Sequence, residues 1–265
     1  MMIQDLNNHF YNPTYYNIKP MDDDFILCYK NGYVLLIDNQ IPLYKNCRRK
    51  CIFGFTIDGN KYFISLEVEN KDLECKDINV FRYYEPHYQA FAIITGYHLW
   101  RWYQKNKYCG NCGKELIYGE KERKVLCPNC GNEEFPKICP AVIVGLLHNG
   151  RILLTKYRVG YSQYALVAGY TEIGETLEQT VCREVYEEVG LHVKNLRYYK
   201  SQPWGASGSI LAGFFADVID DNDEPVLQLD ELKEAKWFTK DEIDLPSDNI
   251  SLTREMILLF KNGDV

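Results

Sequence analysis

The chain has 265 residues, of which 46% are hydrophobic and 25% are charged, and its formal net charge is −7 at pH 7. These values are ordinary for a soluble globular protein and fit about two domains. No uninterrupted apolar run is long enough to span a membrane, and the N-terminus lacks the pattern of a secretory signal. The negative charge argues against a broad basic surface for nucleic acid, although it leaves room for a local patch.

The first segment, residues 1–105, reads as a β-rich domain. Asp58-Gly59-Asn60 separates two runs of β-forming residues, which is a strong hairpin signal. A further β-rich run follows Asn31-Gly32, and apolar residues at helical spacing predict a helix from about residue 88 to residue 105. Cys47 and Cys51 have no second cysteine pair nearby, so we expect buried or idle thiols rather than metal ligands.

The second segment, residues 106–136, carries four cysteines at metal-binding spacing. Cys109-Gly-Asn-Cys112 and Cys127-Pro-Asn-Cys130 are two Cys-x₂-Cys pairs separated by fourteen residues, and a glycine follows each pair. Four thiolates satisfy a closed, tetrahedral, structural zinc site, which leaves no open position for catalysis. The spacing therefore predicts a zinc ribbon. Thiolates kept for zinc need a reducing compartment, so we expect a cytoplasmic protein.

The third segment, residues 137–265, alternates strands and helices. A helix should begin at Leu177, because Thr176 and Gln179 form a capping-box signal, and should end at Gly190. Helices beside a mixed sheet predict an α/β sandwich. We expect strands at 141–147, 152–156, 164–167, 210–218 and 235–238, and a closing helix at 251–261.

The helix expected at Leu177 has an acidic face opposite an apolar stripe. Glu184, Glu187 and Glu188 lie on the acidic face, where like charges repel one another. A divalent cation reverses that repulsion, because Mg²⁺ and Mn²⁺ take hard carboxylate oxygens as ligands. Arg183 can hold Glu187 by an ion pair. An acidic helix face alone is more often simply solvated. The stripe consists of Leu177, Val181, Val185 and Val189.

The stretch Gly169–Leu191 has a fixed pattern of glycines and charged residues. It runs as a glycine, five residues, Glu175, seven residues, and then Arg183-Glu184-Val185-Tyr186-Glu187-Glu188-Val189-Gly190-Leu191. Every fixed position of the Nudix box is occupied, so the stretch resembles the catalytic loop and helix of Nudix hydrolases. The resemblance implies magnesium-dependent cleavage of a nucleoside diphosphate linked to another group, with Glu175 orienting the loop or a water.

A second motif narrows the resemblance. Ser201-Gln202-Pro203-Trp204 follows the box by about ten residues, and Ser209 stands where a longer motif ends. Together with the four-cysteine ribbon ahead of the box, this order resembles the NADH pyrophosphatase, or NAD(H) diphosphatase, family. The resemblance is specific from about residue 108 to residue 260 and weak before that. It implies a homodimer with sites built near the subunit interface.

The resemblance also implies roles for single residues. The backbone carbonyl of Ala168 and the side chains of Glu184, Glu188 and Glu231 would hold the catalytic ions. Glu187 or Glu231 would accept a proton, and the sequence leaves that choice open. Without the resemblance, we would interpret Glu231 as a solvated charge, and Tyr170 and Phe135 as ordinary core residues. Those implied to contact the substrate are Glu122, Phe135, Tyr170, Gln202, Pro203, Trp204, Ser209 and Thr253.

The chain departs from the family pattern directly after Trp204. Gly205-Ala206-Ser207, followed by Gly208, replaces the family's Pro-Phe-Pro. We include these four residues among the expected substrate contacts, but without prolines and an aromatic ring the loop should be more flexible and the pocket wider. The departure bears on the preference for NAD(H) and not on diphosphate hydrolysis.

The sequence thus predicts metal-dependent hydrolysis of NAD(H) to nicotinamide mononucleotide and AMP, through attack of a metal-activated water on one phosphorus. RNA with a 5′ NAD cap contains the same bond. The alternative within enzymes is ADP-ribose or another nucleoside diphosphate derivative. From a different class, the chain could be a nucleic-acid-binding regulator that uses the ribbon and carries a silent Nudix domain. The intact glutamates and the absence of a basic stripe argue against that reading.

Overall fold

The computed structural model describes residues 2–67, 73–159, 163–219, 224–244 and 250–265. The chain forms two compact units. The N-terminal unit contains Ile3–Lys137 together with the short segment Gly205–Gly208. The C-terminal unit contains Ile138–Trp204 and Ser209–Val265, with Met2 buried in one of its cores. The first two segments expected from the sequence therefore fall in one unit.

The N-terminal unit is built on a six-stranded sheet in the order β1-β4-β5-β2-β3-β6. The expected hairpin between β4 and β5 is confirmed, with Asp58 and Gly59 at φ 52° and 78°, as a tight turn between strands requires. The strands are β1 (Tyr11–Asn12), β2 (Phe25–Lys30), β3 (Tyr33–Leu36), β4 (Cys51–Ile57), β5 (Asn60–Ser65) and β6 (Glu74–Asp77). Short 3₁₀ helices lie at Tyr44–Asn46 and Ile78–Arg82.

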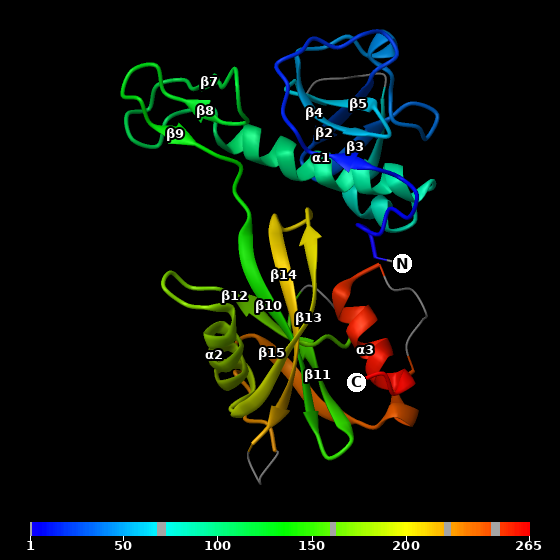
Figure 1. The fold of residues 1–265 in the computed structure, drawn as a ribbon, viewed down its shortest axis with the longest axis vertical. Coiled ribbons are helices and arrows are strands. Elements are labelled where there is room, and N and C mark those ends of the chain that lie inside the picture. The colour runs from blue at the N-terminus through cyan, green and yellow to red at the C-terminus, as the bar shows by residue number, and fades with distance from the viewer. Residues whose placement is uncertain (1, 68–72, 160–162, 220–223, 245–249) are drawn as a thin grey trace. The chain divides into compact units, whose positions relative to one another are not determined.

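Helix α1 (His87–Lys105) packs against this sheet (Figure 1). The Tyr29 hydroxyl of β2 donates a hydrogen bond to the Ile93 carbonyl of the helix at 2.6 Å. Gly96 makes the close approach possible, because a Cβ there would lie 2.5 Å from a Leu27 methyl carbon and 2.6 Å from the Tyr29 hydroxyl. The helix expected from about residue 88 is confirmed.

The zinc ribbon follows α1 and shares a core with it. Its three short strands are β7 (Ile117–Tyr118), β8 (Val125–Leu126) and β9 (Glu133–Glu134). Ile52 and Leu66 from the six-stranded sheet pack against the same cluster, which explains why ribbon and β-rich segment form one unit. The buried members of the cluster are Trp102, Tyr103, Cys109, Leu116, Val125 and Cys127.

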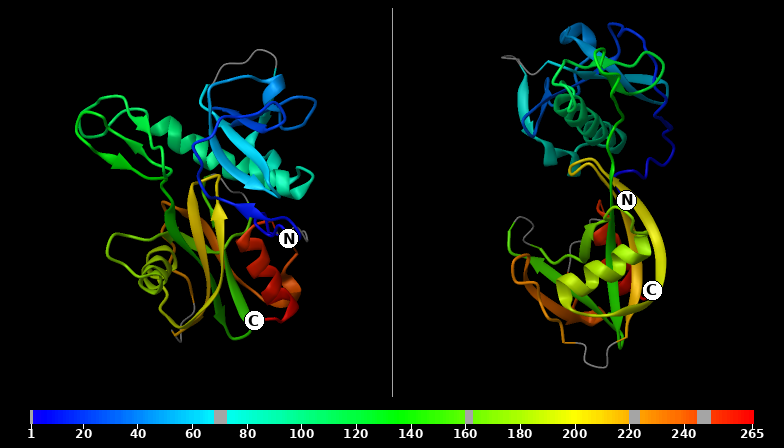
Figure 2. Two further views of the ribbon diagram at one scale, coloured as in Figure 1. Left: turned by 45° about the horizontal axis from the view of Figure 1, so that its top comes forward. Right: turned by 90° about the vertical axis from the view of Figure 1, so that its left-hand side faces the viewer.

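The C-terminal unit is a mixed sheet covered by helices on both faces, so the expected α/β sandwich is confirmed (Figure 2). The order is β13-β14-β10-β11-β15, with β12 paired to β10, and only β10 and β14 run parallel. The strands are β10 (Cys139–His148), β11 (Arg151–Tyr157), β12 (Val167–Tyr170), β13 (Val193–Trp204), β14 (Ser209–Val218) and β15 (Leu232–Phe238).

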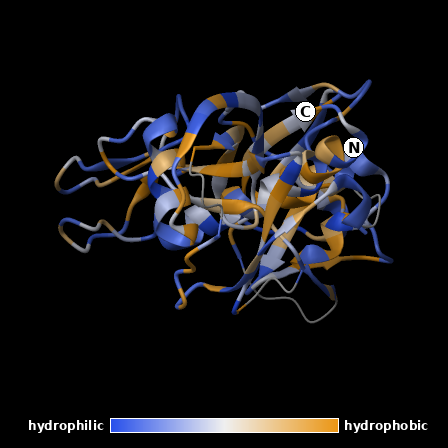
Figure 3. Cartoon of the chain, turned by 90° about the horizontal axis from the view of Figure 1, so that it is seen from below, coloured by the Kyte–Doolittle hydropathy of each residue, from blue (hydrophilic) through white to orange (hydrophobic). Residues whose placement is uncertain are grey.

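Two cores, one on each face, fix the helices of this unit. Helix α2 (Leu177–Val189) contributes its apolar stripe to one core, and α3 (Leu252–Asn262) contributes Leu252, Met256, Ile257 and Phe260 to the other. A 3₁₀ turn at Lys240–Glu242 lies between β15 and α3. Figure 3 shows hydrophobic residues concentrated along the strands and hydrophilic ones along many loops. Within the described ranges, no helix is long and apolar enough to cross a membrane.

Candidate active site

Helix α2 begins and ends where the sequence predicts. The Thr176 hydroxyl accepts a hydrogen bond from the Gln179 backbone N–H at 3.2 Å, and the Gln179 side chain accepts from the Thr176 N–H at 2.8 Å. Gly190 ends the helix in the left-handed conformation at φ 68°. The capping box and the terminal glycine fix the register of the helix, and with it the direction of each glutamate.

Glu175 fastens the loop before α2 to the helix itself. Its carboxylate accepts hydrogen bonds from Arg183 Nε at 2.6 Å and Nη2 at 2.9 Å. It also accepts from the Glu172 backbone N–H and the Thr180 hydroxyl, each at 3.0 Å. The Arg183 guanidinium and then the Glu172 N–H lower the pKa of Glu175 to about 2. The arrangement matches the expectation that Glu175 orients the loop.

Arg183 joins the loop to two glutamates of the acidic face. Its Nη1 lies 2.9 Å from a Glu187 oxygen, which confirms the expected ion pair, and 2.8 Å from a Glu184 oxygen, which the sequence did not indicate. Its Nη2 donates to the Tyr170 carbonyl at 2.9 Å. One guanidinium, with five donors in a planar fork, therefore positions both β12 and the carboxylates of α2.

Glu184 lies directly against the backbone of β12. A Cβ added at Gly169 would overlap the Glu184 carboxyl group, so only glycine leaves room for it. Burial raises the pKa of Glu184, and the Arg183 guanidinium opposes that effect. The first glycine of the box thus makes space for a carboxylate from the helix.

Glu188 is a buried carboxylate, and no Lys, Arg or His in the described ranges forms an ion pair with it. Glu188 is 1% exposed, and neither oxygen has a hydrogen-bond partner of ordinary geometry among the described residues, although the backbone N–H of Ala168 is near enough to lower its pKa. Burial, followed by the charges of Glu184 and Glu231, raises its pKa to about 8. A buried group of this kind is costly unless it is neutralised or binds a cation. Hard oxygen ligands fit Mg²⁺ or Mn²⁺ better than a softer metal ion.

Glu231 reaches the same region from a different part of the chain. It stands just before β15, and its backbone carbonyl accepts a hydrogen bond from the Arg158 N–H at 2.9 Å. Its charge acts on Glu184, on Glu188 and on the Tyr157 hydroxyl at the end of β11. Burial, and then Glu188, Glu231 and Glu184, raise the pKa of Tyr157. Three of the predicted ligands are therefore neighbours, and Tyr157 is a neighbour that the sequence did not reveal.

Ala168 places its backbone beside these acids. It lies in β12, opposite Ile143 of β10, and immediately precedes the glycine that contacts Glu184. Gly169 and Ala168 belong to a strand that contacts α2 directly. That the Ala168 carbonyl binds a metal ion stays a prediction.

The four ribbon cysteines form a compact thiolate cluster. Their sulfur atoms all lie within 4.8 Å of one another, and the Sγ atoms of Cys109 and Cys130 are 3.6 Å apart. In the described part of the chain this is the one group of three or more possible ligand atoms that meets this distance. Gly113 and Gly131 follow the two pairs at φ 72° and 75°, so the knuckles need glycine there. The cluster fits a structural zinc ion with four sulfur ligands.

The predicted substrate contacts of the C-terminal unit differ in exposure. Tyr170 is 53% exposed, so its ring is not a core residue and is available for stacking. Thr253 is the second residue of α3, two positions after the Ser251 cap. Pro203 and Trp204 end β13, and Trp204 pairs with the buried Ser209 at the start of β14.

Gln202 is held differently from the others. Its side chain is fully buried, donates to the Ile250 carbonyl at 2.9 Å and accepts from the Leu252 N–H at 2.7 Å. These bonds tie β13 to the start of α3 and so position Thr253. Direct contact between Gln202 and a substrate stays a prediction.

Comparisons with known proteins agree with this geometry. A NUDIX domain model matches residues 137–260, and a model of the NADH pyrophosphatase zinc ribbon domain matches residues 104–135. A Haemophilus influenzae protein (strain ATCC 51907 / DSM 11121 / KW20 / Rd) named NAD-capped RNA hydrolase NudC is 33% identical over 230 residues, or 83% of this chain and 86% of that protein. The chain is a Nudix hydrolase of the NADH pyrophosphatase family.

Two further comparisons cover less of the chain. A protein of the same name from strain PittGG is 38% identical over 161 residues, and the match spans 60% of its length and 59% of this chain. A crystal structure of a NUDIX hydrolase from Nitrosomonas europaea aligns with a TM-score of 0.51 at 22% identity, over 60% of this chain and 92% of that chain. This likeness shows the fold alone.

The Nudix hydrolase carries its remaining predicted substrate contacts in the N-terminal unit. Phe135 is 51% exposed, and Lys124 Nζ lies 5.8 Å from the centre of its ring. Glu122 is exposed and pairs with Lys124 at 2.9 Å. Both lie at the ribbon, so their part in a substrate site stays a prediction.

The small residues after Trp204 have a packing reason that the sequence did not show. A Cβ at Gly205 would overlap the Ile94 carbonyl of α1. A Cβ at Gly208 would lie 3.1 Å from His98 Nε2, which is a tight contact. Arg101 donates a hydrogen bond to the Ala206 carbonyl. Loss of the family's Pro-Phe-Pro therefore allows a close approach to α1. The greater flexibility expected for this loop, and the substrate contacts expected of Ser207 and its neighbours, stay predictions.

Proposed function

We propose that this Nudix hydrolase cleaves the diphosphate bond of NAD(H), which releases nicotinamide mononucleotide and AMP. The observation that carries the proposal is Glu188, whose two buried oxygens lie beside Glu184 and Glu231 and accept no hydrogen bond of ordinary geometry from the residues that the structure describes. The relatives named NAD-capped RNA hydrolase support NAD as the dinucleotide, because one of them aligns over 86% of its length.

The proposed ion site consists of Glu184, Glu188, Glu231 and the carbonyl of Ala168. Mg²⁺ or Mn²⁺ bound there would lower the pKa of an attacking water and neutralise charge on the diphosphate oxygens. The protein's own part is to keep four oxygens in place. Arg183 fixes Glu184 at 2.8 Å, Gly169 gives that carboxylate its space, and burial on the sheet fixes Glu188.

Proton transfer needs a further base, and two glutamates are candidates. Glu187 is bound by Arg183 at 2.9 Å, whereas no hydrogen bond or ion pair joins the Glu231 side chain to a described residue. Both residues are exposed to solvent. The pH profile of kcat distinguishes them, because replacing the base with Gln removes one limb of the profile while replacing the other glutamate leaves both limbs.

Tyr170 is the proposed platform for a base of the substrate. Its exposed ring stands at the end of β12, two residues after Ala168, and its carbonyl is fixed by Arg183. Stacking is worth about 1–3 kcal/mol per base, so Tyr170→Ala should raise KM by roughly 5- to 150-fold while Tyr170→Phe should not.

RNA with a 5′ NAD cap is the proposed second substrate, since the name of the two Haemophilus relatives describes that activity and the bond is the same. A homodimer is also proposed, on the family resemblance. Sedimentation of the zinc-loaded chain tests it: a mass of one chain across the working concentrations would contradict the dimer.

A substrate panel tests the function. The full zinc-loaded chain is incubated with Mg²⁺ or Mn²⁺ and, separately, NADH, NAD⁺, ADP-ribose and NAD-capped RNA, and products are resolved by chromatography. We expect AMP and a nicotinamide mononucleotide from NADH, and loss of most turnover with Glu188→Gln. Faster cleavage of ADP-ribose than of NADH would assign the enzyme to that substrate instead. No product from any dinucleotide would favour a silent Nudix domain and a binding role.

A further inference from the structure

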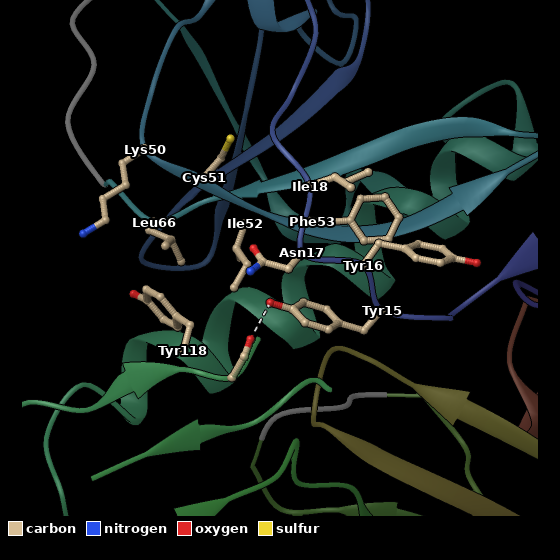
Figure 4. A pocket seen from close by; sticks show the side chains of 11 residues that line it. Tyr15, Tyr16, Asn17, Ile18, Lys50, Cys51, Ile52, Phe53, Leu66 and Tyr118 are labelled. Carbon is tan, nitrogen blue, oxygen red and sulfur yellow. Dashed lines mark hydrogen bonds between the residues drawn. The ribbon is translucent and has the colours of Figure 1, made fainter. Parts of the chain in front are cut away.

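The N-terminal unit contains a pocket lined by its own residues (Figure 4). It lies where residues 15–18, the start of β4 and the strand β7 of the ribbon meet. Its volume is about 160 Å³. A cavity of roughly 150 Å³ can hold one benzene ring, so the space suits a single planar ring and not a whole dinucleotide.

Three tyrosines supply aromatic walls, and each is held by a neighbour. The Tyr15 hydroxyl donates to the Gly119 carbonyl at 3.0 Å, the dashed line of Figure 4. Tyr16 meets Phe53 edge-on at 5.6 Å between ring centres, and Tyr118 meets Tyr103 in the same way at 5.7 Å. Edge contacts of this kind orient a ring and leave part of its face uncovered.

The tyrosines at the mouth remain open to solvent. Tyr16 is 46% exposed and Tyr118 is 39% exposed. Ile18, which also lines the pocket, is 41% exposed. Large exposed apolar side chains gathered around one hollow are typical of a binding site rather than of ordinary surface.

The polar groups of the pocket suit a base with an attached phosphate. The Asn17 amide can both donate and accept, as the edge of a base requires. Lys50 is an exposed lining residue and forms no ion pair with a described residue. By contrast, Lys45 and Arg48 of the same basic run are paired with Asp23 and Asp22 at 2.7 and 2.6 Å.

The distribution of charge along the chain is compatible with a phosphate-bearing ligand in the N-terminal unit. Residues 1–137 contain 18 Lys and Arg against 17 Asp and Glu, whereas residues 138–265 contain 12 against 20. The excess negative charge therefore belongs to the catalytic segment. The segment with the aromatic pocket is near neutral, and an anionic strand can approach it with little long-range repulsion.

We propose that this pocket binds one nucleotide of single-stranded RNA, with its base between the tyrosines and a neighbouring phosphate against Lys50. Stacking on aromatic rings with a nearby cation is how proteins hold single strands. An apolar protein side chain would fill the space but would bring no anion to Lys50, which pairs with none of the described acids. The site is additional to the diphosphatase site, and only the turnover measurement below rests on the proposed function.

Direct binding tests the site without hydrolysis. The full zinc-loaded chain carrying Glu188→Gln is titrated, without added divalent ions, into a fluorescently labelled, uncapped single-stranded RNA of ten nucleotides, and anisotropy is recorded at two salt concentrations. Tyr16→Ala and Tyr118→Ala should each weaken binding by roughly 5- to 150-fold. Lys50→Gln should lower the salt slope by about 0.7, the value for one phosphate contact on a single strand.

Matched variants separate stacking from folding. Tyr16→Phe and Tyr118→Phe keep the rings and should bind as the parent does. Tyr83→Ala removes a tyrosine that is 79% exposed and outside the pocket, and should have no effect. Turnover is measured in the active chain, which keeps Glu188. There, Tyr118→Ala should leave zinc content and NADH turnover unchanged, whereas kcat/KM for NAD-capped RNA should fall.

Each remaining outcome overturns the proposal. RNA binding that all three pocket variants leave intact would place the RNA elsewhere. Free AMP that displaces the RNA at equal concentration would make the ligand a mononucleotide. No RNA binding at all would exclude the site, even if NADH hydrolysis is normal, and so would distinguish this failure from failure of the proposed function.

Discussion

Gly169 and the carboxylate of Glu184 are in direct contact, with no space between them for a methyl group. The first glycine of the box is therefore required by a side chain of α2 and not by its own backbone angles, because its φ is not in the left-handed region. This contact joins β12, which carries Ala168, to the helix that carries the acidic face.

Gly169→Ala should impair turnover more than folding. The added methyl group displaces the Glu184 carboxylate, and disturbing the support of a metal ligand typically costs about 10–100-fold in activity or metal affinity. Steady-state NADH hydrolysis and the Mg²⁺ dependence of the rate measure the loss. Combining Gly169→Ala with Glu184→Asp should lose less than the two single changes together, since the shorter side chain relieves the overlap. Strict additivity would show that the two residues act separately.

Glu175→Gln should destabilise the protein in a pH-dependent way. The pKa of Glu175 is lowered to about 2 by Arg183, so its ionised form stabilises the fold above the ordinary value near 4.5. That contribution is lost as the pH falls from about 4.5 through 2, where the native state takes up the proton. Urea midpoints of parent and variant should therefore differ at pH 7 and converge toward pH 2. A constant difference across that range would contradict the assignment.

The sequence predicted the elements whose signals are local. The cap at Thr176, the stripe along α2, the glycine at 190 and the turn at Asp58-Gly59 each depend on neighbours within a few residues, and the structure bears them out. The spacing of the four cysteines is equally local and identified the thiolate cluster.

Features made by distant contacts escaped prediction. Strand β13 was missed because most of its residues are not buried and it is interrupted by two register shifts, so no apolar alternation marks it. The strand expected at 164–167 is wrong in position, since regular pairing begins only at Val167 and Ala165 forms an isolated bridge. The buried Gln202 and the Tyr157 hydroxyl beside the acids depend on how separate strands meet.

Glu188→Gln should abolish most turnover and yet stabilise the metal-free chain. The pKa of Glu188 is raised to about 8 by burial and by two neighbouring glutamates, so the native state holds its proton more tightly than the unfolded state does. Stability is then lost as the pH rises from about 4.5 through 8. The amide removes this loss, and the melting temperature of the variant should exceed that of the parent increasingly over that range.

Glu178→Gln provides the control for this prediction. Glu178 lies in the first turn of the same helix and is exposed, so its charge is screened by water. Both activity and the pH dependence of melting should stay near those of the parent. If the Glu188→Gln chain hydrolyses NADH at the parental rate, the proposed ion site is wrong.

Removing zinc should unfold the ribbon together with its shared core. Cys109 and Cys127 are both ligand candidates and members of the cluster that includes Trp102 and Val125. Structural zinc contributes on the order of 10 kcal/mol to such small sites. Cys127→Ser should therefore lower zinc content below one ion per chain and expose Trp102, measured by its fluorescence. Cys75→Ser, at an exposed thiol outside the cluster, should change neither.

Gly205→Ala should destabilise the packing of its loop on α1. The new methyl group would overlap the Ile94 carbonyl, and overpacking of this kind typically costs about 1–3 kcal/mol. Thermal unfolding should show a melting temperature lower by roughly 2–12 °C, at about 2–4 °C per kcal/mol for a protein of this size. Gly110→Ala is the matched control, because a Cβ there meets no atom within 4 Å and the glycine has no positive φ. Equal melting of the two variants would mean that the loop does not approach α1, and the substitution of small residues for Pro-Phe-Pro would then be explained by substrate preference alone.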